Sequence, residues 1–128
     1  MNRSQALLPV VLLLASTGKA AEPINFTKDQ VTAGQAVYRE SCQLCHGNTL
    51  ANGQFATPLK GEPFQEKWKG KTLGELLEFV YEKMPPDKLK SLTPEQYTSA
   101  VAFILSRNGL PASETALTTD KPAQALPW

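Results

Sequence analysis

Apolar residues recur with helical spacing in three stretches of the chain, at residues 33–41, 73–83 and 94–108. A threonine precedes each stretch, and a Gln or Glu follows three residues after it: the threonines are Thr32, Thr72 and Thr93. That spacing is typical of a capping box, which satisfies free amide groups in the first helical turn. No segment shows the alternation of a strand. The pattern therefore predicts an all-α domain with three main helices and long loops.

Prolines and a glycine predict where two of these helices end. Pro85 and Pro86 cannot continue the second helix, so it should end near Lys83. Gly109 suits the left-handed position that follows a helix. Met84 is thus expected in an extended segment just past a helix end.

The other segments are predicted to be irregular. Residues 47–70 are rich in Gly, Asn, Pro and Thr, and predict a long loop that wraps something. Leu59, Phe64 and Trp68 in this loop would form a pocket wall, although ordinary core packing predicts the same burial. Residues 111–128 contain three prolines and predict an extended tail, mobile by default, with packing over the domain or contact with a partner as the alternatives.

The N-terminus has the pattern of a secretory signal peptide. Arg3 precedes the apolar run 6–15, and small residues follow at Gly18 and Ala20. The run is shorter than the roughly 20 residues that span a bilayer, so no membrane span is expected after cleavage, with an uncleaved anchor as the alternative. The predicted divisions are a signal peptide (1–20), an N-terminal extension (21–31), the domain (32–110) and the tail (111–128).

Charge adds little to this organisation. The whole chain carries a formal charge of +1, and loss of Arg3 and Lys19 would leave about −1. Such a balance gives no reason to expect nucleic-acid binding. The two cysteines lie in one motif, so no others remain for a disulfide framework.

The segment Cys42-Gln43-Leu44-Cys45-His46 is the strongest chemical signal. The C-x-x-C-H pattern is typical of c-type haem attachment, with two thioethers to the haem and the histidine as an iron ligand. A redox disulfide would need a βαβ setting that the pattern lacks. A structural zinc site would need a fourth ligand, and His46 is the only histidine. Export of such a motif favours the bacterial periplasm.

The second iron ligand follows by elimination. With one histidine in the chain, bis-histidine ligation within it is excluded. Met84 is the only methionine left after signal cleavage, and a thioether favours ferrous iron. The alternatives are that Met84 fills a gap in the core, that a lysine binds the iron, or that the position stays open.

The chain resembles the class I c-type cytochromes over residues 31–111. The resemblance rests on CQLCHG, on the segment Pro58-Leu59-Lys60-Gly61, and on Met84-Pro85 after a helix. It implies the cytochrome c fold around one covalently attached haem. It also implies that the Pro58 carbonyl accepts a hydrogen bond from the His46 ring, and that the terminal helices cross at Gly34, Tyr38 and Tyr97. Spacing alone would equally allow Gly34 to be a tolerated surface glycine.

The segment MPPDKLKSLTPEQYTSAVAFILSRNGLPA is similar to cytochromes that work with PQQ-dependent alcohol dehydrogenases. Together these observations predict a monomeric periplasmic electron carrier, not an enzyme. It would pass single electrons from a dehydrogenase, such as a quinoprotein dehydrogenase, to an acceptor such as a terminal oxidase. The cofactor-binding residues would be Cys42, Cys45, Pro58, Leu59 and Trp68, and the metal ligands His46 and Met84.

Two other functions stay open. Without Met84 ligation, the protein would be a haem enzyme or sensor with an open iron site. Alternatively, it would be a haem subunit bound to a dehydrogenase, with the tail ending in Trp128 as a tether. A lysine cluster would form a docking face or a merely solvated surface; its members are Lys60, Lys67, Lys69 and Lys71.

Overall fold

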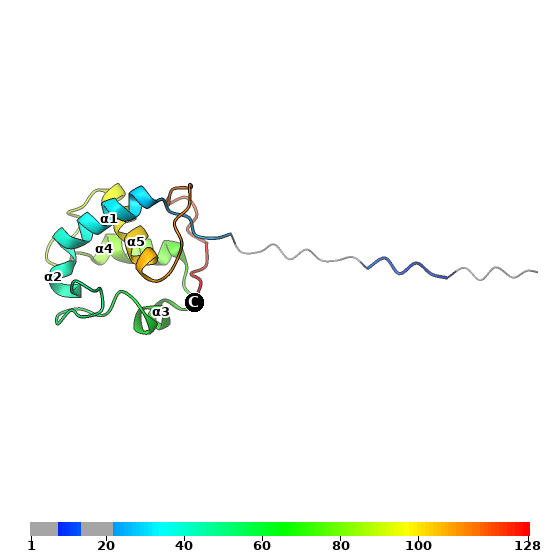
Figure 1. Ribbon diagram of the computed structural model, residues 1–128, viewed down its shortest axis with the longest axis horizontal. Helices are drawn as coiled ribbons and strands as arrows, with labels where there is room; N and C mark the ends of the chain where they lie inside the picture. Colours follow the sequence, from blue (N-terminus) through cyan, green and yellow to red (C-terminus); the bar gives the residue numbers. More distant parts are fainter. Residues whose placement is uncertain (1–7, 14–21) are drawn as a thin grey trace, which may run out of the picture.

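The computed structural model describes residues 8–13 and 22–128, and its regular secondary structure is helical (Figure 1). The helices are α1 (Lys28–Ser41), α2 (Gln43–His46), α3 (Glu62–Trp68), α4 (Leu73–Lys83) and α5 (Pro94–Arg107). Within these residues the β-structure is a single bridge between Thr72 and Ala125. The predicted all-α fold is confirmed, with α1, α4 and α5 as its three main helices.

The start of α1 lies five residues before the predicted one. Its N-cap is Thr27, whose hydroxyl accepts from the Gln30 amide at 3.2 Å, and the Gln30 side chain accepts from the Thr27 amide at 3.1 Å. The sequence holds two successive candidate boxes, Thr27 with Gln30 and Thr32 with Gln35, and the prediction of Thr32 as the N-cap is wrong. The earlier box wins because Phe26 is fully buried and anchors the chain just ahead of it.

Helices α1 and α5 cross in close contact (Figure 1). A Cβ at Gly34 would overlap the carbonyl oxygen of Ser99, so only glycine fits this crossing. The Tyr38 ring packs on Phe103 with 5.3 Å between centroids. The close approach at Gly34 is confirmed. Tyr97 is not the aromatic residue at the crossing, because its ring packs instead on Tyr81.

The region predicted as a loop from 47 to 70 contains the helix α3. Gly61 precedes this helix and a proline lies in its first turn. Phe64 and Trp68 lie four residues apart on one face, and both are buried. Seven residues are too few to show a clear helical period, so the prediction of an uninterrupted loop is wrong.

The starts and ends of α4 and α5 agree with the predictions. Thr72 and Thr93 each form a full capping box, with Glu75 and Gln96 as their partners. Gly109 follows α5 with a φ of 93°, in the left-handed region.

The C-terminal segment is packed against the domain, so the default expectation of a mobile tail is wrong and the alternative, a tail that lies over the domain, is confirmed. The amides of Leu73 and Gly74 donate to the carbonyls of Gln124 and Pro122 at 2.8 and 3.0 Å. Leu117 and Leu126 are buried, and the ring of the final residue, Trp128, packs edge-on against Phe64. The C-terminus accordingly lies beside α3 (Figure 1). The sequence did not predict these contacts, because the segment is rich in proline and small polar residues and only isolated leucines reach the core.

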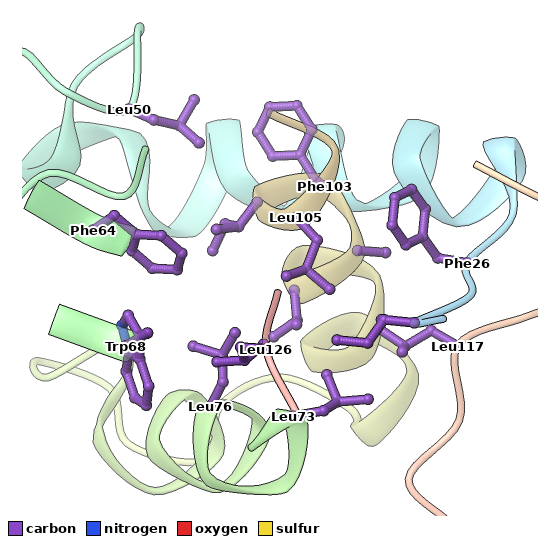
Figure 2. Close-up of a cluster of buried hydrophobic side chains, with 14 of the residues drawn as sticks. Phe26, Leu50, Phe64, Trp68, Leu73, Leu76, Phe103, Leu105, Leu117 and Leu126 are labelled. Carbon is purple, nitrogen blue, oxygen red and sulfur yellow. The ribbon is translucent and has the colours of Figure 1, made fainter. Parts of the chain in front are cut away.

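The hydrophobic core joins side chains from α1, α3, α4, α5 and the C-terminal segment. Figure 2 shows Phe64 and Trp68 from α3 next to Leu76 from α4 and Leu126. The core thus fixes α3 and α4 relative to each other.

The predicted signal peptide falls largely on residues 1–7 and 14–20, which lie outside the described residues. Its described part, residues 8–13, is exposed and has no regular secondary structure. Among the described helices, none combines the length and the apolar character needed to cross a bilayer.

Candidate functional site

A mostly apolar cavity of about 280 Å³ opens between α2, α3, α4, α5 and the segment 55–59. All seven predicted site residues line it: Cys42, Cys45, His46, Pro58, Leu59, Trp68 and Met84. Phe64 and Leu76, drawn in Figure 2, also contribute to its wall. The fold therefore brings together seven predicted residues that are up to 42 positions apart in the sequence, from Cys42 to Met84.

A hydrogen bond from its ring to the backbone holds His46 in place. The side chain is buried, with 7% exposure, and Nδ1 lies 2.8 Å from the carbonyl oxygen of Thr57. A carbonyl oxygen only accepts, so Nδ1 carries the proton and Nε2 keeps a free lone pair for a metal. The expectation that Pro58 supplies this carbonyl is wrong by one residue.

The surroundings of His46 favour its neutral form. Burial lowers the pKa of His46 below its usual value, and the charge of Lys67 lowers it further. The hydrogen bond to Thr57 opposes these effects. A neutral imidazole is the form that binds a metal.

The two thiols are free and adjoin the same cavity. Burial, and then the neighbouring Cys45, raise the pKa of the Cys42 thiol to about 11. In the described part of the chain, no three His, Cys, Asp or Glu side chains gather as a metal site. The motif therefore lacks the further ligands that a structural zinc ion would need.

Tight backbone packing encloses the motif. The Tyr38 hydroxyl donates to the Gly47 carbonyl at 2.6 Å, and burial is the main cause that raises the pKa of Tyr38 to about 12. A Cβ at Gly53 would overlap the Cys45 carbonyl oxygen. The chain after His46 thus folds back directly over the motif.

Met84 reaches the cavity from the end of α4. Its backbone is extended, with φ −124° and ψ 143°, and its amide donates to the Val80 carbonyl at 3.0 Å. The Tyr97 hydroxyl donates to the Met84 carbonyl at 2.8 Å. These bonds fix the backbone of Met84, while its thioether lines the cavity.

Three contributors to the site were not found by sequence reasoning. The Thr57 carbonyl gives no signal, because every residue has one. Tyr97 was assigned to the helix crossing, although its place beside Met84 follows from its position early in α5. Asn108 bonds to the segment that lines the cavity, and its location directly after α5 was the only hint.

The donor set fits a covalently bound haem. Two free thiols, an imidazole with a free Nε2 and a thioether line a single cavity whose other residues are largely apolar. Haem iron commonly takes histidine and methionine as axial ligands.

A family model described as "Cytochrome C oxidase, cbb3-type, subunit III" matches residues 29–104, which is more than half of the chain. The chain belongs to this cytochrome c family. The matched range runs from the first turn of α1 into α5, so it contains the motif, α3, α4, Met84 and most of α5. Membership implies covalently bound haem c, and it favours electron transfer over catalysis.

The cytochrome c domain is also similar to a solved structure. A chain of the sulfane dehydrogenase SoxCD from Paracoccus pantotrophus aligns with a TM-score of 0.55 and 23% identity. The alignment covers 88% of this chain and 68% of that one. At this identity the likeness supports the fold alone. A search of the curated proteins found no match.

Proposed function

We propose that this cytochrome c domain is a periplasmic carrier that holds one haem c and transfers single electrons between protein partners. The observation that carries the proposal is the convergence of Cys42, Cys45, His46 and Met84 on one cavity. When bound, haem c supplies a reversible one-electron couple between ferrous and ferric iron.

The residues of the motif would have separate roles in holding the haem. Cys42 and Cys45 would each form a thioether, so that the haem stays attached in both oxidation states. His46 would bind the iron through Nε2, because its Nδ1 proton is engaged by Thr57. Met84 would be the second iron ligand and leave no open site for a substrate.

The cavity walls would keep water from the iron. Trp68 packs edge-on against Phe79 with 5.4 Å between centroids, and Phe64 packs on Trp68 at 6.3 Å. Pro58 and Leu59 line the cavity near the His46 side. A dry, rigid pocket changes little when the iron changes charge, which suits rapid electron transfer.

The partner would dock over the uncharged edge of the cavity. Residues 41–59 contain no Asp, Glu, Lys or Arg. Leu44 and Phe55 in this segment are 90% and 77% exposed, and Phe55 also lines the cavity. This edge fits a redox protein with an apolar docking face and a small, transient interface.

The lysine cluster offers a less coherent surface for docking. Lys67 lies 4.9 Å from the centroid of Phe79, and Lys69 lies 3.9 Å from the Glu66 carboxylate. Two of the four lysines are thus engaged within the chain, which favours the interpretation as an ordinary solvated face.

Attachment is tested by replacing Cys42 and Cys45 together with alanine. The wild-type chain should retain haem through denaturing electrophoresis, with a mass increase equal to a single haem. The double variant should lose both signals. Covalent haem in the double variant, or none in the wild type, would contradict the attachment.

The donor is proposed to be a periplasmic dehydrogenase. A quinoprotein alcohol dehydrogenase stays a prediction of the C-terminal resemblance. The alternative predicted from the sequence is a haem subunit bound stably to a dehydrogenase, with the C-terminal segment as its contact. Gel filtration of a periplasmic extract with the full chain separates the two. A monomer-sized cytochrome supports the carrier, and coelution with a dehydrogenase supports the subunit.

A further inference from the structure

The side chain of Asn108 links the end of α5 to the segment that lines the cavity. Its Nδ2 donates to the carbonyls of Leu59 and Ile104, each at 2.9 Å. Its Oδ1 accepts from the Gly61 amide at 3.0 Å. One carboxamide thus uses both donor and acceptor to fix two peptide groups of residues 59–61.

The segment held by Asn108 is continuous with the partner of the His46 ring. Leu59 is held on its other side as well, because its amide donates to the Leu50 carbonyl at 2.7 Å. Only Pro58 separates Leu59 from Thr57, and its ring restricts the backbone between them. A fixed Leu59 therefore limits where the Thr57 carbonyl can lie relative to Nδ1 of His46.

We propose that Asn108 is a positioning residue for the iron ligand His46. It holds residues 59–61 against α5, and through them it aims the Thr57 carbonyl at the imidazole. A strong acceptor at Nδ1 makes a histidine ligand more basic, which stabilises ferric iron. Asn108 therefore sets part of the reduction potential without touching the haem. This inference rests on the proposed function, in which His46 binds the iron.

Asn108→Ala in the haem-loaded protein tests the proposal. The backbone of Asn108 has φ −96° and ψ 13°, so alanine introduces no strain. The His46 Nδ1 proton, observed by NMR, should exchange with solvent about tenfold faster because its acceptor is less well fixed. The midpoint potential should rise, because a less basic ligand stabilises ferric iron less.

Gln30→Ala is the matched control. The Gln30 carboxamide also makes a paired bond with a distant peptide group, donating to the Leu117 carbonyl at 3.0 Å and accepting from the Leu117 amide at 2.8 Å. Gln30 does not line the cavity. Gln30→Ala also removes the bond from the Thr27 amide, as Asn108→Ala removes the bond to Ile104, so each variant loses three bonds. Gln30→Ala should lower the stability comparably, yet leave the potential and the ring-proton exchange at wild-type values.

A potential that stays unchanged or falls in Asn108→Ala, or exchange no faster than in Gln30→Ala, would overturn the role of Asn108. If the alanine variant does not fold, Asn108→Ser replaces it. Serine is uncharged and cannot reproduce the paired bonds of a carboxamide to Leu59 and Gly61, so shifts in the same directions are expected, and their absence overturns the proposal. A wild-type protein without a slowly exchanging His46 proton would likewise overturn the role of Asn108. A wild-type protein without covalent haem would refute the proposed function instead.

Discussion

The two sides of the cavity hold their proposed iron ligands in different ways. On one side, His46 is buried and its ring is bonded to Thr57. On the other side, Met84 is partly exposed, and the bonds that fix it are made by its backbone, to Val80 and Tyr97. The histidine is thus held through its side chain, and the methionine through its main chain.

This difference predicts that changes on the two sides affect the stability of the fold and the iron site to different degrees. The His46 side is also packed against the backbone at Gly53, so changes there should affect stability and the iron site together. The thioether of Met84 can leave the iron without breaking a hydrogen bond of the fold. Changes on the Met84 side should therefore alter the chemistry more than the stability.

Met84→Ala is expected to have the largest effect on the iron. Loss of the thioether removes a ligand that favours ferrous iron, so the midpoint potential should fall by more than about 59 mV, a tenfold change for one electron. Cyanide or carbon monoxide should then bind rapidly. Val80→Ala, which trims the same wall without removing a ligand, should shift the potential far less. Equal shifts in the potentials of the two variants would contradict the assignment of Met84 as an iron ligand.

Gly53→Ala tests the His46 side. A Cβ there meets the Cys45 carbonyl and the His46 backbone, so the variant should lose about 1–3 kcal/mol of unfolding free energy and show a changed haem spectrum. Gly74→Ala is a similar overpacking away from the cavity, with its Cβ 2.6 Å from Cβ of Pro122. It should destabilise the protein and leave the spectrum unaltered. If Gly53→Ala is destabilised but keeps the wild-type haem spectrum, packing on the His46 side does not affect the iron site, which would contradict the comparison.

Tyr97→Phe should have the smallest effect. It keeps the ring packing on Tyr81 and removes the bond to the Met84 carbonyl, at a cost of about 0.5–1.5 kcal/mol. Cyanide should bind the ferric protein several-fold faster, because the methionine backbone is less fixed. Tyr38→Phe removes the corresponding bond to Gly47 on the His46 side and should leave that rate unchanged. The comparison fails if both variants behave alike in stopped-flow measurements.

Local signals in the sequence predicted the elements that depend on local chemistry. The capping boxes at Thr72 and Thr93, the stop at Gly109 and the all-α class required only neighbouring residues, and all are confirmed. The sequence pattern failed where tertiary contacts decide. The choice of Thr27 over Thr32 depends on the burial of Phe26, and the packed C-terminal segment depends on Leu117 and Leu126.

The site shows the same division. The motif and Met84 were predicted by residue type and spacing, and the structure places them around one cavity. The acceptor for the His46 ring was predicted to be the Pro58 carbonyl and is the Thr57 carbonyl. Every residue has a backbone carbonyl, so residue type could not tell the two apart. The bonds of Asn108 to Leu59 and Gly61 span almost 50 residues, beyond the reach of any local pattern.

The near-infrared spectrum of the oxidised, haem-loaded protein tests the central claim most directly. Ligation by His46 and Met84 predicts a sulfur-to-iron charge-transfer band that is present in the wild type and absent in Met84→Ala. A wild-type spectrum without this band, together with rapid cyanide binding, would contradict the carrier and favour an open iron site.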